Sequence, residues 1–189
     1  KSDGVNGIEL WRSDGTETGT IMVKDINPGV GDSNPFNFIV FNNSLYFIAT
    51  DGVSNKLWKT DGTSTCTIPL AEAGGSFSTS GLISMAVQNN YLFFPGVDAV
   101  NGMELWKTDG TPGGTVIVKD INPGVASSNL ANFINVGNKI VFQATTISSG
   151  AEPWSSDGTA SGTNIMHDIE PGSGSSLIDR FTIVGSKLF

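Results

Sequence analysis

The sequence has almost none of the side chains on which metal and nucleophilic chemistry most often depend. Its 189 residues include one cysteine, Cys66, and one histidine, His167. One cysteine excludes an internal disulfide, and the two residues are too few for a transition-metal site. His167 precedes Asp168, but adjacent side chains on a strand point to opposite faces, so the pair forms no catalytic dyad by default. Since Gly-x-Ser-x-Gly and phosphate-loop motifs are also missing, the sequence favours a noncatalytic protein.

Basic residues and long apolar runs are scarce as well. Ten Lys and Arg stand against eighteen Asp and Glu, which gives a formal charge of −8, and no basic stripe is present. Nucleic acid is therefore not an expected partner. No apolar run approaches the roughly 20 residues that span a bilayer, so we expect no membrane insertion.

One phrase, Glu-Leu-Trp-x-Ser/Thr-Asp-Gly-Thr, returns four times with small changes. Its tryptophans lie 47, 48 and 48 residues apart, at Trp11, Trp58, Trp106 and Trp154. A period of this length without helical patterning is typical of β units that bury their apolar faces on one another. The 24 glycines and the 15% of charged residues agree with a turn-rich all-β chain.

Each repeat divides into four short β-favouring segments. In one copy these are residues 37–41, 45–48, 56–59 and 67–70. Asn42-Asn43 is expected to join the first two as a tight hairpin, because Asn tolerates a positive φ. The same place is held by Asn89-Asn90, Gly137-Asn138 and Gly185-Ser186. After the third segment, an Asp-Gly turn is expected to be braced by its aspartate: Asp14, Asp61, Asp109 or Asp157.

These patterns predict an all-β fold: a β-propeller of four-stranded antiparallel blades, with four repeats of about 48 residues in a single domain over 1–189. Residues 184–189 match a repeat up to its second strand, and residues 1–11 resume the repeat before its third. We therefore expect a four-bladed ring in which both termini complete one blade. The alternative is half of a seven- or eight-bladed propeller.

The four tryptophans allow two interpretations. A flat indole can stack on a sugar, which would suit a lectin, but a large apolar side chain repeated once per unit is more typical of packing between blades. The sequence favours the core role. The same role is expected for Phe47, Phe94 and Phe142 of the second segment and for Phe38, Phe133 and Phe181 of the first.

One acidic position recurs after the fourth segment, at Asp25, Glu72, Asp120 and Asp168. In a closed ring these carboxylates would occupy related places on one face, and an approach to the axis would favour a bound Ca²⁺, which prefers oxygen ligands. The four residues are therefore a candidate metal site. In the alternative interpretation, each carboxylate accepts hydrogen bonds from the turn that follows it. No catalytic residue and no other cofactor is predicted.

Two sets of loops combine acidic or amide side chains with glycine. The first comprises residues 3–7, 51–55, 98–102 and 146–150, and the second comprises residues 27–34, 122–129 and 170–176. Such loops could bind a cation or sugar hydroxyls, although surface turns select the same residue types. The sequence assigns no ligand to them.

The repeated phrase, followed by Val-Lys-Asp-Ile-Asn-Pro-Gly at residues 23–29 and 118–124, resembles the bacterial ELWxxDGT repeat family, also described as hyalin-like. The resemblance covers the whole chain. It implies a secreted or cell-surface bacterial protein with a binding or adhesive role. Lys56, in place of Glu, and Pro153, in place of Leu, depart from the pattern.

The sequence thus predicts a noncatalytic extracellular binding or adhesion module, whose weak sites repeat on a rigid propeller and gain strength through avidity. The expected partner is a glycan or protein ligand at a cell surface, and self-association with other copies is a further expectation. One alternative is a structural segment of a long surface protein or filament. Another is a carbohydrate-binding lectin or a carbohydrate-active enzyme, which would need a carboxylate pair that the other repeats lack.

Overall fold

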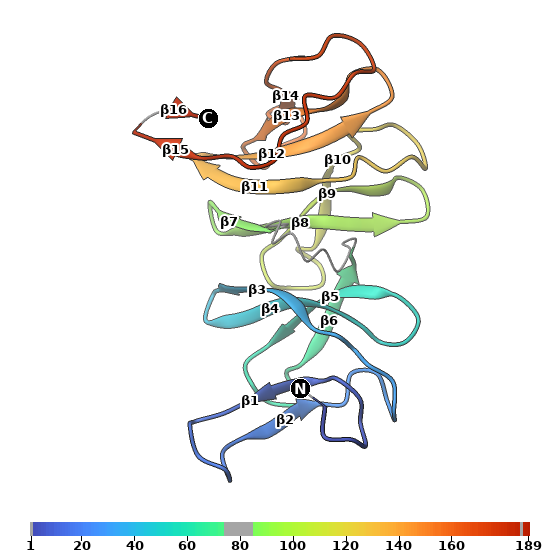
Figure 1. Ribbon diagram of the computed structural model, residues 1–189, viewed down its shortest axis with the longest axis vertical. Coiled ribbons are helices and arrows are strands. Elements are labelled where there is room, and N and C mark those ends of the chain that lie inside the picture. Colours follow the sequence, from blue (N-terminus) through green and yellow to red (C-terminus); the bar gives the residue numbers. More distant parts are fainter. Residues whose placement is uncertain (1, 74–84, 186) are drawn as a thin grey trace. The chain divides into compact units, whose positions relative to one another are not determined.

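The computed structural model describes residues 2–73, 85–185 and 187–189. Within these residues the chain forms strands and turns, and no helix long and apolar enough to cross a membrane occurs. Contacts divide the chain into two compact units, Lys1–Gly75 and Ser76–Phe189, and each is described by itself (Figure 1). The single domain over 1–189 stays a prediction.

The first unit contains two antiparallel sheets. A two-stranded sheet pairs β1 (Leu10–Arg12) with β2 (Ile21–Lys24). A four-stranded sheet follows, in the order β3 (Phe36–Phe41), β4 (Ser44–Thr50), β5 (Asn55–Thr60) and β6 (Ile68–Glu72). Each strand pairs with the next one in the sequence, so the sheet is a simple meander.

The second unit repeats this plan. One four-stranded sheet contains β7 (Ala86–Gln88), β8 (Tyr91–Asp98), β9 (Gly102–Thr108) and β10 (Val116–Lys119). The next contains β11 (Ala131–Val136), β12 (Lys139–Thr146), β13 (Gly150–Ser156) and β14 (Asn164–Ile165). A two-stranded sheet of β15 (Ile183–Val184) and β16 (Lys187–Leu188) ends the chain. Its strands correspond to the first two of a repeat, whereas β1 and β2 correspond to the last two.

The first two strands of each four-stranded sheet are joined as the sequence predicts. Phe41 pairs with Ser44, and Gln88 pairs with Tyr91, so two residues close each hairpin. Asn42 and Asn43 adopt φ values of 46° and 57°, and Asn89 and Asn90 adopt 50° and 62°. The mirror-image turn that these angles form matches the right-handed twist of the flanking strands.

The predicted turn aspartates form the same hydrogen bonds in every copy. In the last copy, Asp157 Oδ1 accepts the backbone N–H of Thr159 at 2.9 Å and its hydroxyl at 2.7 Å. The equivalent carboxylates Asp14, Asp61 and Asp109 bind Thr16, Thr63 and Thr111 in the same way. These bonds hold the pKa of Asp14, Asp61 and Asp157 below the ordinary value.

The core lies between sheets within each unit. Phe47, Phe94 and Phe142 are fully buried, and each lies opposite the tryptophan of its own repeat. The predicted core role of Phe133 is also confirmed, because its ring stacks on Phe142 with centroids 5.3 Å apart. Phe38 is different: it stacks on Phe47, yet 53% of it stays exposed, so the prediction of a buried residue is wrong there.

The four-stranded antiparallel sheets, repeated along the chain, confirm the all-β class. The described sheets do not close on themselves, so the four-bladed ring stays a prediction.

Candidate functional site

Antiparallel order brings two sets of loops to one end of every repeat. The loop between the second and third strands lies at the same end of its sheet as the segment that leaves the fourth strand, because successive strands run in opposite directions. In the first repeat, the backbone N–H of Ile8 donates to Asp32 Oδ1 at 2.7 Å, and that of Ser33 donates to the carbonyl of Ile8 at 3.0 Å. We call this part of a repeat its loop end.

The loop between the second and third strands is held by its own acidic side chain. Asp3 Oδ1 accepts the backbone N–H groups of Val5 and Asn6 at 2.9 and 2.8 Å. Asp51 and Asp98 accept the corresponding N–H groups in the next two repeats. Bonding to the Asn6 N–H lowers the pKa of Asp3 to about 2, and bonding to Lys56 lowers that of Asp51 to about 2. These loops therefore stay anionic over the physiological pH range.

An exposed β-branched side chain occupies the tip of this loop in all four repeats. The exposed fractions are 67% for Val5, 89% for Val53, 71% for Val100 and 78% for Ile147. This set was not predicted from the sequence, although an aliphatic residue stands two positions after Asp3, Asp51 and Asp98. None of these side chains takes part in the hydrogen bonds that hold the turn.

A buried glutamate ties the two loops of a repeat together. Glu104 is fully buried, and its carboxylate accepts the backbone N–H groups of Ile121 at 2.8 Å and Asn122 at 3.4 Å. Glu9 binds Ile26 and Asn27 in the same way, and Glu152 binds Ile169 and Glu170. The first residue of the repeated phrase is therefore a clamp, a role that the sequence analysis did not assign.

Burial raises the pKa of Glu104 to about 7, against an ordinary value of 4.5. Three groups oppose that effect by bonding to the carboxylate: the N–H groups of Ile121 and Asn122 and the hydroxyl of Ser128. The nearby charge of Asp120 raises the pKa further. Desolvation thus outweighs the hydrogen bonds at this residue.

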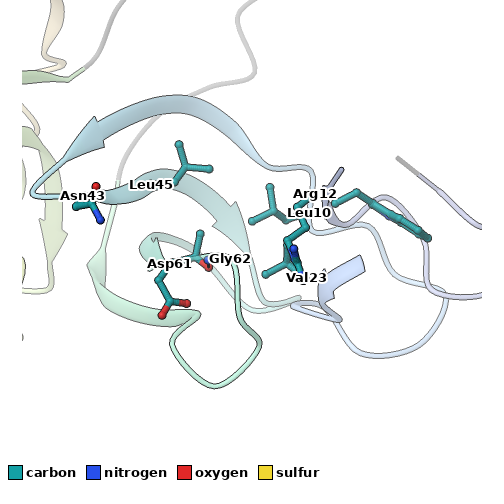
Figure 2. Close-up of a pocket in the computed structure, with 9 residues that line it drawn as sticks. Leu10, Arg12, Val23, Asn43, Leu45, Asp61 and Gly62 are labelled. Carbon is teal, nitrogen blue, oxygen red and sulfur yellow. Dashed lines mark hydrogen bonds between the residues drawn. The ribbon is translucent and has the colours of Figure 1, made fainter. Parts of the chain in front are cut away.

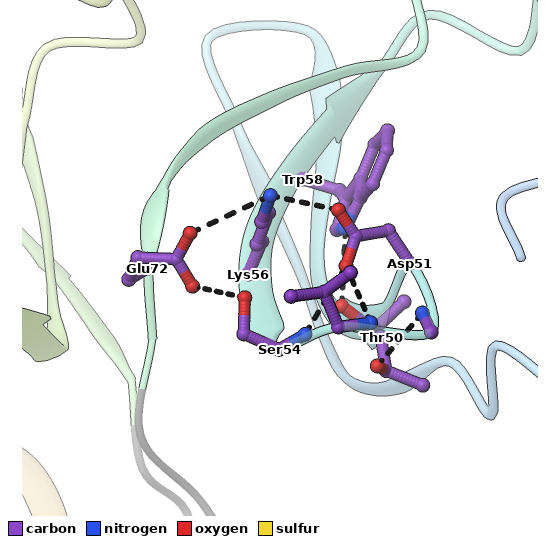
Figure 3. Close-up of polar contacts among 9 residues, drawn as sticks. Thr50, Asp51, Ser54, Lys56, Trp58 and Glu72 are labelled. Carbon is purple, nitrogen blue, oxygen red and sulfur yellow. Dashed lines mark hydrogen bonds and ion pairs between the residues drawn. The ribbon is translucent and has the colours of Figure 1, made fainter.

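The second repeat replaces this clamp with an ion pair (Figure 3). Lys56 Nζ lies 2.7 Å from Asp51 Oδ2 and 3.4 Å from Glu72 Oε1, and the Ser54 hydroxyl donates to Glu72 Oε2. In the second repeat a basic residue, Lys56, thus stands where the other repeats have the buried glutamate, and it contacts Glu72 at the end of the fourth strand.

The four candidate metal residues fall into two groups. Asp25, Asp120 and Asp168 each accept the backbone N–H of the glycine four residues later, at 3.2, 3.2 and 3.3 Å. These bonds agree with the alternative interpretation, in which each carboxylate accepts hydrogen bonds from the turn that follows it. Glu72 forms no such bond in the described residues and contacts Lys56. Among the residues that the structure describes, no three His, Cys, Asp or Glu side chains are grouped to hold a metal. The Oδ1 atoms of Asp25, Asp120 and Asp168 are nevertheless buried and accept no hydrogen bond from the described residues. The Ca²⁺ site stays a prediction.

The remaining candidates are the tryptophans, the single histidine and the single cysteine. Trp58 and Trp154 are 5% and 8% exposed, so neither offers a ring face on which a sugar could stack. His167 and Cys66 are both exposed, and Cys66 is a free thiol. Cys66 stands where the other repeats have Gly19, Gly114 and Gly162.

A pocket of about 320 Å³ lies within the first unit (Figure 2). The two-stranded sheet contributes Leu10, Trp11, Arg12 and Val23, and the four-stranded sheet contributes Asn43, Leu45, Thr60, Asp61 and Gly62. Its walls are mainly apolar, and it has no cluster of acids or bases.

No protein-family model and no curated protein sequence matches the chain. Among solved structures, the chain is similar to a puromycin hydrolase, with a TM-score of 0.55 and 16% identity over 90% of this chain. The S511A mutant of puromycin hydrolase complexed with PGG matches with a TM-score of 0.54 and 18% identity over 86%. The chain spans about a quarter of the length of these proteins, 25% in both matches.

An α-L-arabinofuranosidase from Clostridium thermocellum matches over 80% of this chain and 57% of its own, with 13% identity and a TM-score of 0.35. That TM-score is too low to carry an argument. At 16% and 18% identity, the puromycin hydrolase matches show the fold alone. They support a β-propeller-like arrangement of the sheets and carry no activity over to this chain.

Proposed function

We propose that the chain is a noncatalytic, extracellular binding module whose loop ends contact a partner surface. The observation that carries the proposal is the exposed aliphatic residue at the loop tip of every repeat: Val5, Val53, Val100 and Ile147. Burying one such side chain in an interface contributes roughly 1.5–3 kcal/mol. Three equivalent positions, together with Ile147 in the corresponding loop of the fourth repeat, therefore offer several weak contacts that act together.

Charge near these tips indicates the chemistry of the partner. Asp3, Asp32, Asp51 and Asp98 lie in or against the tip loops, and the carboxylates of Asp3 and Asp51 keep a low pKa. Lys56, the basic residue among them, contacts Asp51 and Glu72. A surface that combines acidic and exposed aliphatic side chains is complementary to a protein partner that presents lysine or arginine beside apolar side chains.

The proposal includes a four-bladed ring. The first and last two-stranded sheets carry complementary halves of one repeat, which supports a fourth blade made from both. A rigid ring would fix the spacing of the loop ends, and fixed spacing is what avidity requires. The secreted or cell-surface setting rests on the family resemblance.

Binding to a basic, aliphatic probe tests the proposed function. The full chain would be immobilised and titrated with a synthetic peptide of alternating Lys and Val, beside an acidic peptide and a panel of glycans. A loop-tip variant carries V5T, V53T, V100T and I147T: the three Val→Thr changes keep the side-chain shape but remove apolar surface, and I147T also removes the terminal methyl group. Val40→Thr is the matched control, because Val40 is 70% exposed on β3, away from these loops.

We expect the basic peptide to bind at low salt, the loop-tip variant to lose at least tenfold in affinity, and Val40→Thr to leave it unchanged. Equal binding by the loop-tip variant would contradict the proposal. Preference for a glycan would favour the lectin alternative, and binding to no probe would favour a structural segment.

A further inference from the structure

A leucine of the second unit has a backbone conformation that disfavours its side chain. Leu177 lies in the segment that leaves the fourth repeat and has a φ of 49°. The same position holds Asn34 in the first repeat and Asn129 in the third, and both have a φ of 46°. In this left-handed region the Cβ lies too close to the following carbonyl oxygen, a cost that asparagine offsets through local hydrogen bonds of its side chain. Leucine forms no such bonds, so its backbone is strained here.

The Leu177 side chain gains no burial in return for this strain. It is 86% exposed, and the neighbouring Ser176 N–H fixes the backbone by donating to the carbonyl of Ala151 at 3.1 Å. Asn129 is exposed as well, although a four-stranded sheet follows it in the sequence. This position of the repeat therefore faces solvent even where another sheet comes next. A strained residue whose side chain stays exposed indicates a role beyond folding.

Leu177 belongs to a group of exposed aliphatic side chains on the loop ends of the second unit. The others are Val100, Val125 and Ile147, which are 71%, 77% and 78% exposed. We call these four side chains the aliphatic row. A Cβ atom added to Gly102 would lie 2.7 Å from the carbonyl oxygen of Val125, so the loop that carries Val100 lies against the turn that carries Val125.

Hydrogen bonds connect the fourth repeat to this pair of loops. The backbone N–H of Ile147 donates to Asn122 Oδ1 at 3.2 Å, in the turn that carries Val125. The N–H of Ala151, which follows the loop of Ile147, donates to Ser175 Oγ at 3.0 Å, two residues before Leu177. All four segments are thus linked within one unit, and the aliphatic row lies on one connected surface.

The charge around the aliphatic row is negative. Its segments, residues 98–102, 122–129, 146–150 and 170–177, contain Asp98 and Glu170 and no lysine or arginine. Hydrogen bonds from the side chain and backbone of Asn101 hold the pKa of Asp98 below its ordinary value. Glu170 is exposed. Thr146 stands where the loops of the other repeats have an aspartate, so the loop of Ile147 itself is uncharged.

We propose that Leu177 is the apolar anchor of a protein-binding surface formed by the aliphatic row. The occupant is a segment of a partner protein that packs aliphatic side chains on Leu177 and Ile147 and directs lysine or arginine toward Asp98 and Glu170. Burial of the Leu177 side chain by the partner offsets the strain of its backbone. This inference rests on the proposed function and adds the residue on which binding depends most.

Replacing Leu177 with asparagine separates binding from stability. Leu177→Asn introduces the residue that the first and third repeats have at this position. We expect it to relieve the backbone strain and raise Tm by roughly 2–4 °C. The same change should weaken binding of the Lys-Val peptide about tenfold or more, because it removes the apolar side chain on which the peptide packs. A purely structural role for Leu177 would not move the two quantities in opposite directions.

Two further variants and a second peptide serve as controls. Asn129→Leu is the converse exchange at the same position of the third repeat and should lower Tm by a similar amount. Val116→Thr should leave binding unchanged, because Val116 begins β10 at the opposite end of the sheet from the loop end. A peptide with threonine in place of valine keeps the charge and the side-chain shape. We expect Leu177→Asn to change its affinity less than twofold.

The possible results discriminate between this inference and the proposed function. Unchanged affinity of Leu177→Asn for the Lys-Val peptide, while the loop-tip variant loses affinity, would overturn the anchor alone. Equal losses for both peptides would overturn the apolar contact and assign the effect to charge or shape. An unchanged or lowered Tm would overturn the strain on which the inference depends. Failure of the unmodified chain to bind either peptide would overturn the proposed function and the anchor with it.

Discussion

Glu104 is a carboxylate that the fold buries completely and then holds with backbone N–H groups. Its pKa is about 7 in the folded chain, above the ordinary value of 4.5. The folded state therefore binds more protons than the unfolded state between these values, and stability falls as pH rises through that window. Ionisation of the buried Glu104 carboxyl group therefore lowers the free energy of unfolding at neutral pH.

Urea unfolding from pH 4.5 to pH 8 tests this description of Glu104. We expect the free energy of unfolding to decrease with pH by an amount on the order of 3 kcal/mol at most, and Glu104→Gln to remove most of that slope. Glu17→Gln is the matched control, because Glu17 is exposed. A slope that Glu104→Gln leaves unaltered would assign the pH dependence to other groups.

Gly162 shows how tightly the Asp-Gly turn is built. A Cβ atom at this position would lie 2.1 Å from Asp157 Oδ1, the atom that binds Thr159. We expect Gly162→Ala to cost about 1–3 kcal/mol in chemical unfolding, because the carboxylate must move from its partners. Gly113→Ala has nothing within 4 Å of its added Cβ and should cost less than half as much. Equal losses of stability in Gly162→Ala and Gly113→Ala would show that the loss comes only from the altered conformational freedom of the backbone.

The second repeat already carries a side chain at this position. The backbone N–H of Cys66 lies 3.3 Å from the Thr63 hydroxyl, whereas Gly19 and Gly162 lie 2.9 Å from theirs. The turn thus accepts a Cβ by lengthening one hydrogen bond, which places the expected cost for Gly162→Ala at the lower end of the range.

At the scale of the strands, an ion pair joins β5 to β6 in the second repeat. Lys56 contacts Asp51 and Glu72, and these contacts raise the pKa of Lys56. Lys56→Glu would restore the repeated phrase but place three carboxylates together. We expect a loss of about 1–2 kcal/mol that shrinks between 50 mM and 1 M NaCl, because salt screens the repulsion.

Lys139→Glu serves as the control for this charge reversal, since Lys139 is exposed on β12 and interacts with the charge of Asp157 without the close ion pairs of Lys56. Equal stability of Lys56→Glu and the unmodified chain would show that the repeated phrase, and not its local partners, decides which residue is tolerated.

The strands and their turns were predictable because their signals are local. Asn42-Asn43 and Asp61-Gly62 specify backbone conformations within two or three residues, and four copies of each pattern agree. The clamp of Glu104 was not predictable in the same way, because its partners lie 17 and 18 residues later in the sequence. The prediction that Phe38 is buried was wrong for a related reason: its burial depends on a neighbouring sheet and not on its own strand.

At the scale of the whole chain, the sequence period predicts repeated four-stranded sheets, and the described residues confirm them. Ring closure and calcium binding are long-range properties, which a repeat pattern suggests but does not decide. The pocket beside Leu10 and Val23 could not be predicted either, because it lies between two sheets whose packing the repeat pattern does not specify.

The candidate calcium residues can be tested on the intact chain. If Asp25, Glu72, Asp120 and Asp168 bind Ca²⁺, millimolar CaCl₂ should raise Tm by about 2–4 °C relative to EDTA, and Asp120→Asn should remove part of the rise. Equimolar MgCl₂ is the control, because Mg²⁺ demands a stricter geometry. A Tm that calcium does not change would leave Asp25, Asp120 and Asp168 with the turn role alone, and Glu72 with its contact to Lys56.

Repeats of nearly identical sequence carry a risk during folding, because a strand from one copy can pair with a neighbour's partner strand and trap the chain in a wrong connection. Lys56 is positively charged where the other repeats have a glutamate, and this difference limits mispairing of the second repeat with another one. Lys56 of β5 contacts Asp51 and Glu72 of its own repeat, and Ser54 binds Glu72, whereas the other repeats have Asp25, Asp120 and Asp168 at the position of Glu72. The repeat that departs most from the shared phrase thereby helps the strands of a repetitive chain to pair with the strands of their own repeat.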